Sequence, residues 1–133
     1  MGKKKVVLDT NILISALGWQ GKPRILFDEI LSGKYRLVIS KAQIKELLRV
    51  MDYPKFKFSE KQKTSFLTIL TEISEIIETK GTINLIQEDL DDNIILETAK
   101  LSNANYIISG DEHLLKLKRY HKTKITPVSE FLS

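Results

Sequence analysis

Short apolar runs alternate along this chain with longer segments of helical periodicity, and this alternation constrains the fold more than any other feature. Val6-Val7-Leu8, Leu37-Val38-Ile39 and Tyr106-Ile107-Ile108 are apolar at consecutive positions, which is typical of strands buried on both faces. The segments predicted as strands are residues 4–8, 37–39, 83–86, 106–108 and 124–126.

Helices are predicted between these strands. Ser40 and Gln43 form a capping-box pattern that starts one helix, and Lys80-Gly81 ends a longer one. The predicted helical segments are residues 11–17, 23–31, 40–51, 59–79, 88–103, 112–118 and 128–132. Strands that alternate with helices predict the α/β class, as a three-layer α/β/α sandwich with a central parallel sheet.

Length and composition narrow the function classes. The chain has 133 residues, which suits one domain spanning 1–133. It has no Cys, which excludes disulfide scaffolds, zinc ribbons, iron-sulfur clusters and cysteine nucleophiles. A metal site would therefore use oxygen or imidazole ligands. The formal net charge of +4 permits a polyanionic partner without demonstrating one.

The first residues imitate a signal peptide, with a basic stretch followed by Val6-Val7-Leu8. Asp9 and Asn11 interrupt the apolar run, so no export is expected. No apolar segment reaches the length that spans a bilayer. The sequence thus predicts a soluble, cytoplasmic protein without a membrane partner.

Two aspartates stand at the carboxyl ends of predicted strands. Asp9-Thr10-Asn11 follows the first strand, and Ser109-Gly110-Asp111 follows the strand at 106–108. Ligands of open parallel sheets bind beyond these ends, and carboxylate oxygens are the ligands that magnesium or manganese prefers. For each aspartate taken alone, a helix N-cap is the favoured interpretation, and the presence of two at strand ends shifts the balance toward a site.

Other acids have competing interpretations. Asp91 and Asp92 could be ordinary acidic residues of a helix start, but Asp92 shares a stripe with Leu96 and Ala99 that should face the sheet. Glu46 follows the capping box at Ser40, where a solvated glutamate is the default. Two carboxylates about 4 Å apart repel by roughly 4 kcal/mol at an effective dielectric of 20. Converging acids therefore imply a metal, and scattered acids imply caps and surface.

The order of these motifs resembles the PIN-domain family over essentially the whole chain. Asp9-Thr10-Asn11, a helix with Glu46, Asp91-Asp92-Asn93 and Ser109-Gly110-Asp111 follow one another at fitting places. Further segments are similar to the VapC-like branch, the toxin components of toxin-antitoxin pairs. They are Ile14-Ser15-Ala16-Leu17-Gly18-Trp19, Leu37-Val38-Ile39-Ser40 and Tyr53-Pro54-Lys55-Phe56.

The resemblance implies a ribonuclease that uses Mg²⁺ or Mn²⁺ to hydrolyse RNA phosphodiester bonds. It implies four carboxylates as metal ligands and catalytic groups, namely Asp9, Glu46, Asp92 and Asp111. Asn11 and Ser109 match the positions that orient them, with Ser109 standing where Thr is usual. Asp91 is either a further ligand through water or only a cap. An antitoxin partner follows from the family alone.

Alternatives stay open beside this interpretation. A non-catalytic RNA- or protein-binding module on the same scaffold is the main rival, although all four acids are present. Trp19, Phe56 and Phe58 could stack on RNA bases or only pack, and packing or a subunit contact is favoured for Trp19. His113 follows Asp111 closely and could approach the phosphate, but an ordinary surface histidine is the favoured interpretation. The long predicted helix is apolar on more than one seam, which predicts a homodimer. The candidates for contacting phosphates are Lys22, Arg24, Lys41, Lys45 and Arg49.

Overall fold

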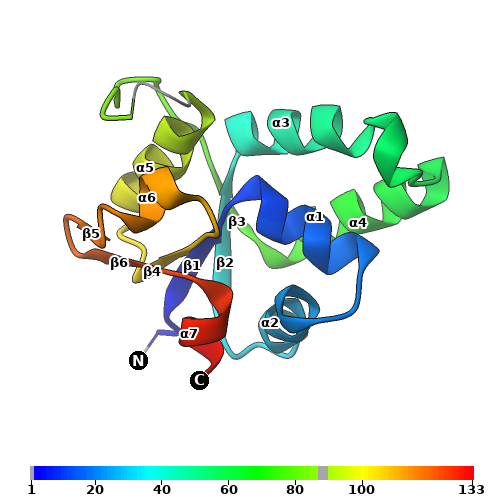
Figure 1. Ribbon diagram of the computed structural model, residues 1–133, viewed down its shortest axis with the longest axis horizontal. Coiled ribbons are helices and arrows are strands. Elements are labelled where there is room, and N and C mark those ends of the chain that lie inside the picture. Colours follow the sequence, from blue (N-terminus) through cyan, green and yellow to red (C-terminus); the bar gives the residue numbers. More distant parts are fainter. Residues whose placement is uncertain (1, 87–89) are drawn as a thin grey trace.

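The computed structural model describes residues 2–86 and 90–133, and their strands form one sheet in the order β3-β2-β1-β4-β6-β5 (Figure 1). β1 to β4 and β6 run parallel, while β5 is antiparallel to β6. The strands are β1 (Lys5–Leu8), β2 (Arg36–Ser40), β3 (Glu75–Ile77), β4 (Tyr106–Ile108), β5 (Arg119–Tyr120) and β6 (Thr123–Thr126). The predicted α/β class is confirmed, and the sheet is mixed at one edge.

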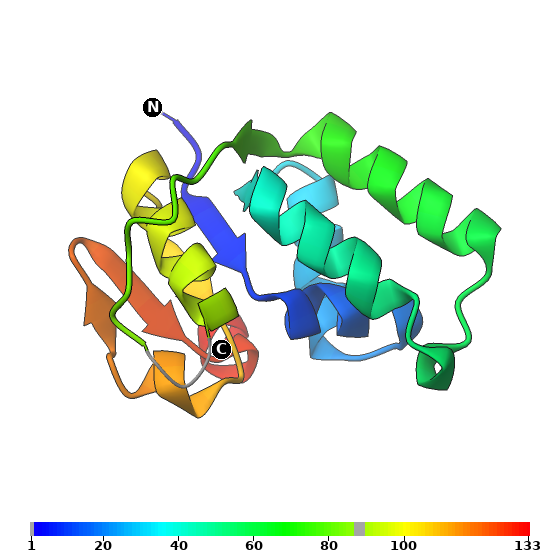
Figure 2. The ribbon, with the colours of Figure 1, turned by 90° about the horizontal axis from the view of Figure 1, so that it is seen from above.

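Helices cover both faces of this sheet. The helices are α1 (Thr10–Gly18), α2 (Lys22–Leu31), α3 (Lys41–Met51), the 3-10 turn η1 (Pro54–Phe56), α4 (Glu60–Ile73), α5 (Leu90–Ser102), α6 (Glu112–Leu115) and α7 (Val128–Leu132). Seen from above, α5 lies on one side of β1, and α1 to α4 lie on the other (Figure 2). No helix within residues 2–86 and 90–133 is long and apolar enough to cross a membrane.

The alternation of side chains along β1 explains why its run is apolar throughout. Val6 and Leu8 join the core cluster under α1 to α4 and α7, while Val7 joins the cluster under α5 and α6. All three side chains are almost completely buried. A strand covered on both faces has no position at which a polar side chain would meet water.

The prediction of one long helix at 59–79 is wrong. α4 ends at Ile73, and the extended backbone of Ser74 leads directly into β3. Ile76 and Ile77, which match a helical stripe in the sequence, pair with β2 at Ile39 and Ser40 instead. Isoleucine at successive positions suits an extended chain as well as a helix, and pairing with β2 decides between them.

The prediction of a strand at 83–86 is also wrong, because these residues belong to a loop. Ile86 is nevertheless buried, and its backbone is held by the side chain of Asn93. The Ile86 amide donates to Asn93 Oδ1 at 2.8 Å, and Asn93 Nδ2 donates to the Ile86 carbonyl at 2.5 Å. The Asn93 side chain thus makes the two hydrogen bonds to the Ile86 backbone that a neighbouring strand would make in a sheet. The predicted helix start at residues 88 and 89 lies outside the described residues.

The prediction of a helix at 112–118 extends too far. α6 ends at Leu115, and the chain then turns into the β5–β6 hairpin. Lys118 and His121, at either end of β5, have left-handed backbone with φ of 61° and 53°. This hairpin supplies the antiparallel edge that the sequence did not reveal. The remaining predicted helices agree with the structure to within about two residues at each end.

Candidate active site

Five carboxylates converge on one small cavity of about 70 Å³ at the carboxyl ends of β1 and β4. Parallel strands end at the same edge of the sheet, which brings residues distant in sequence together there. Glu46 reaches the cavity from α3, while Asp91 and Asp92 reach it from the first turn of α5. The lining residues are Asp9, Thr10, Asn11, Glu46, Val50, Asp91, Asp92, Ile95 and Asp111. The acids predicted from sequence therefore meet at one place.

Asp9 and Asp92 are the most buried of these acids, and each is only 6% exposed. Asp9 Oδ1 accepts a 2.8 Å hydrogen bond from the Ile12 amide, and Asp9 Oδ2 accepts one from the Ser109 hydroxyl. Asp9 is thus the N-cap of α1 as well as a wall of the cavity. Burial raises the pKa of Asp9, although the bonds from Ser109 and Ile12 oppose that shift. A positive charge in the cavity would favour the ionised form.

Ser109 links two of the acids. While its hydroxyl donates to Asp9, its oxygen accepts a 2.9 Å hydrogen bond from the Asp111 amide. Ser109 is fully buried, so these bonds are not exchanged for water. This geometry suits the orienting role predicted for Ser109. Asn11, the other predicted orienting residue, is exposed and lies at the rim of the cavity.

Glu46 is the acid whose environment the sequence least revealed. Burial, together with the nearby Asp91, raises the pKa of Glu46 to about 7. Thr10 donates a hydrogen bond to Glu46 Oε1, which partly opposes this rise. Thr10 was not singled out in the sequence, and its place between Asp9 and Asn11 was the available signal. Arg49 Nη2 lies 3.6 Å from Asp91 Oδ2 on the outer side of the pair.

His113 belongs to the site, contrary to its expected role as an ordinary surface residue. Asp92, Asp111 and His113 each offer one ligand atom, and these atoms lie within 4.8 Å of one another. His113 Nδ1 is 3.4 Å from Asp111 Oδ1, and the same oxygen accepts the His113 amide at 2.7 Å. Asp111 also caps α6. A histidine two residues after a strand-end aspartate was the sequence signal for this placement.

The donor set fits a hard divalent cation. Five carboxylates would repel one another strongly if all were ionised, and the pKa values of Asp9 and Glu46 are both raised. Carboxylate oxygens are the ligands that Mg²⁺ and Mn²⁺ prefer, and the imidazole of His113 is available beside them. The acidic cluster therefore agrees with the divalent metal that the sequence resemblance implies.

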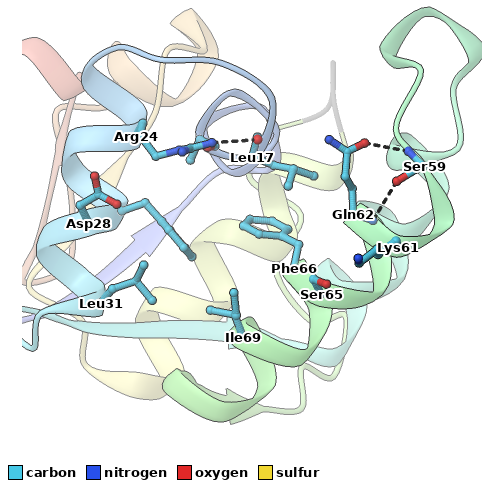
Figure 3. Close-up of a pocket in the computed structure, with 12 residues that line it drawn as sticks. Leu17, Arg24, Asp28, Leu31, Ser59, Lys61, Gln62, Ser65, Phe66 and Ile69 are labelled. Carbon is cyan, nitrogen blue, oxygen red and sulfur yellow. Dashed lines mark hydrogen bonds between the residues drawn. The ribbon is translucent and has the colours of Figure 1, made fainter.

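A larger cavity of about 390 Å³ lies elsewhere, between α1, α2 and α4 (Figure 3). Phe66 and Ile69 of α4 face Leu31 of α2 across it, and it lacks a group of converging acids. Arg24, a predicted phosphate contact, is used here as a helix cap. Its guanidinium donates to the carbonyls of Ala16 at 2.5 Å and Leu17 at 3.0 Å. The smaller cavity is the candidate site because five acids converge on it, although its volume is the lower of the two.

Comparison with known proteins identifies the family. Residues 5–113 match a family model described as PIN domain. The chain belongs to the PIN-domain family. The match of this PIN domain runs from the first residue of β1 to His113, so it includes every carboxylate of the cavity. The resemblance seen in the sequence is thereby confirmed.

A solved structure shows the same fold. The PIN domain is similar to a chain in the crystal structure of VapBC2 from Rickettsia felis bound to a DNA fragment from their promoter. The TM-score is 0.62 at 21% sequence identity, and the match covers 91% of this chain and 96% of that chain. A comparison with curated proteins found no match.

Proposed function

We propose that this PIN domain is a metal-dependent endoribonuclease and the toxin component of a toxin-antitoxin pair. The observation that supports this proposal most is the convergence of Asp9, Glu46, Asp92 and Asp111 on one cavity. Helix capping alone explains the positions of Asp9 and Asp111. It does not explain why acids from α3 and α5 meet them at a shared cavity.

The residues that would hold Mg²⁺ or Mn²⁺ are Asp9, Asp92, Asp111 and Glu46, with Asp91 beside Glu46 and His113 beside Asp111. When bound, the metal would acidify water and offset the charge of the phosphate. In the hydrolysis, a water molecule gives up a proton as its oxygen forms a bond to phosphorus, the phosphorus-oxygen bond of the RNA chain breaks, and the leaving oxygen takes up a proton.

The protein's own residues prepare this chemistry by fixing the acids. Ser109 holds the Asp9 carboxylate through its hydroxyl, and Thr10 holds Glu46 in the same way. We propose that Asp92 or Asp111 accepts a hydrogen bond from the attacking water. Arg49, at the outer edge of the acids, is suited to contact a phosphate next to the cleaved bond.

The test is cleavage of single-stranded RNA with Mg²⁺ or Mn²⁺, with EDTA, and by the Asp9→Asn variant with metal. Asparagine keeps the shape and the capping oxygen of Asp9 but removes the charge, so we expect at least a hundredfold loss of rate because charge at a metal site is lost. Asp28→Asn is a matched control, because Asp28 is exposed and lies at the larger cavity. Equal rates in all three conditions would contradict the nuclease proposal.

Calorimetric titration with Mn²⁺ separates a nuclease from a non-catalytic scaffold, which would not bind the ion.

The proposed partners are RNA and an antitoxin, and the proposed location is the cytoplasm. Support for an antitoxin comes from the sequence resemblance and from the likeness to a chain of the VapBC2 complex. A small open reading frame beside the gene is expected to encode the antitoxin, and co-expression of its product should suppress the RNA cleavage.

We also propose a homodimer. The exposed apolar residues Ile25 and Leu31 on α2 and Ile69 on α4 support it.

A further inference from the structure

Four aromatic side chains gather on the surface where α1 and α3 end, and we call them the aromatic cluster: Trp19, Tyr53, Phe56 and Phe58. Trp19 is 51% exposed and Tyr53 is 38% exposed, while the two phenylalanines are half-buried. The rings of Tyr53 and Phe56 are nearly parallel at 6.3 Å, and those of Phe56 and Phe58 at 5.5 Å. Trp19 meets Phe56 and Phe58 edge-on at 5.9 and 6.3 Å. The cluster therefore presents two exposed rings, Trp19 and Tyr53, above the more buried Phe56 and Phe58.

The backbone beneath the cluster is held in place. η1 is followed by Lys57 in left-handed conformation, with φ of 54°, which turns the chain so that Phe58 stacks on Phe56. Gly18, at the end of α1, is in close approach to the Phe58 ring, because a Cβ there would lie 3.1 Å from it. The rings are thus held by contacts within the chain itself. Rings held in this way lose little entropy when a flat ligand stacks on them.

Cations surround these rings. Lys55 Nζ lies 5.1 Å from the centre of the Phe56 ring, and Lys57 and Arg49 are exposed nearby. The nearby acids Asp52 and Glu60 share one partner, Lys63, at 2.5 and 2.6 Å, and Asp91 lies beside Arg49. The four cations Arg49, Lys55, Lys57 and Lys63 outnumber these three acids by one, so the charge around the cluster is weakly positive. Aromatic faces combined with cations are the features that bind single-stranded nucleic acid.

Arg49 joins this surface to the acidic cavity. Its Nη1 donates to the Tyr53 hydroxyl at 2.8 Å, and its Nη2 lies 3.6 Å from Asp91 Oδ2. One side chain therefore touches both the aromatic cluster and an acid of the candidate active site. A strand that has a phosphate at Arg49 would have a neighbouring base within reach of Tyr53.

We propose that the aromatic cluster is a base-stacking platform for the single-stranded RNA that enters the acidic cavity. The inference rests on the proposed ribonuclease function and names the form of its substrate. An unpaired base would stack on Trp19 or Tyr53, while Arg49, Lys55 and Lys57 meet the flanking phosphates. A duplex would bind poorly, because its bases are already stacked on one another.

Binding can be tested without cleavage, in EDTA, with a labelled single-stranded RNA decamer read by fluorescence anisotropy. We expect Tyr53→Leu and Phe56→Leu each to weaken binding by about tenfold, because stacking on an aromatic ring is lost while apolar bulk is kept. Trp19 is the only tryptophan of the chain, so the same RNA should also quench the intrinsic fluorescence of the wild-type protein. A duplex of the same sequence should neither bind with comparable affinity nor quench the tryptophan fluorescence.

Tyr120→Leu is the matched control. Tyr120 is half-buried beside Arg119 and Lys122, but β5 lies at the opposite end of the molecule from η1 in both views (Figures 1 and 2). Unchanged RNA affinity in Tyr53→Leu and Phe56→Leu, with wild-type circular dichroism, would overturn the platform. So would a wild-type dimer that Trp19→Lys converts to a monomer without weakening RNA binding, because the cluster would then be a contact between copies.

Different results would contradict the platform proposal and the nuclease proposal. RNA binding that depends on the cluster, with no metal-dependent cleavage by the wild-type protein, would support the platform and contradict the nuclease. Cleavage that is equally fast in Tyr53→Leu and Phe56→Leu at limiting RNA would contradict the platform and leave the nuclease standing.

Discussion

At the scale of single residues, Ser109 connects two acids of the candidate site through one buried hydroxyl. It is fully buried between Asp9 and Asp111, and its hydroxyl serves both. Ser109→Ala leaves a buried carboxylate and a backbone amide without this partner, so we expect the free energy of unfolding to fall by about 1–3 kcal/mol. Ser109→Thr keeps the hydroxyl and should retain most of that stability. Urea unfolding measures both variants, with exposed Ser129→Ala as the unaffected control.

Glu46 predicts how the stability of the metal-free protein depends on pH. Its pKa is raised from 4.5 to about 7, so between these values the folded protein keeps a proton that the unfolded chain has lost. Raising the pH through this window therefore lowers the free energy of unfolding, which levels off above about 7. The raised pKa of Asp9 acts in the same direction.

Glu46→Gln tests this pH dependence, because an amide resembles the protonated acid. In EDTA at neutral pH we expect the variant to be more stable than the wild-type protein, while RNA cleavage with metal is lost. Urea unfolding across the pH window should show a flatter slope for Glu46→Gln and an unchanged slope for Glu72→Gln, whose side chain is exposed on α4. A variant that is less stable than the wild type at neutral pH would contradict this account.

At the scale of elements, Asn93 holds the loop that leads into α5. Its side chain satisfies both the amide and the carbonyl of buried Ile86. Asn93→Ala should lower the free energy of unfolding by about 2–4 kcal/mol, because two buried backbone groups lose their partner. Asn84→Ala in the same loop is the control, since Asn84 is exposed, and it should change stability by less than about 0.5 kcal/mol. Equal unfolding curves for the two variants would contradict the role of Asn93.

The elements that sequence patterns could not predict are the edges of the sheet. The inner strands β1, β2 and β4 carry apolar runs that only burial on both faces explains. β3 and the loop at 83–86 both contain β-branched residues, so local pattern cannot say which one pairs with β2. β5 has two residues, Arg119 and Tyr120, which is too short for any periodicity. Tertiary pairing decides such segments.

At the scale of the whole molecule, the candidate site was easier to predict than the edges. Asp9 and Asp111 follow apolar strands directly, so their meeting follows from parallel topology. Glu46 was predictable only through the family resemblance, because a glutamate inside a helix is ordinarily solvated. Thr10 was missed, and His113 was interpreted as a surface residue, because their places depend on side-chain contacts with Glu46 and Asp111.

The homodimer is a prediction for the whole molecule. Ile25, Leu31 and Ile69 expose apolar surface on α2 and α4, and covering it would remove that surface from water. Light scattering should give twice the monomer mass of 15.3 kDa. Ile69→Lys should shift the protein to a monomer, whereas Leu101→Lys on α5 should not. A wild-type monomer at working concentrations would refute the dimer.

The topology also has a consequence for how the protein is made. Asp9 emerges from the ribosome early, but Asp111 stands at the end of β4, which lies between β1 and β6 in the sheet. Asp111 therefore follows Asp9 by 111 − 9 = 102 residues of synthesis. A nascent chain carries its acids apart until β4 and Asp111 have left the ribosome. If the protein cuts RNA, the messenger from which it is being translated meets no assembled cutting site before that point.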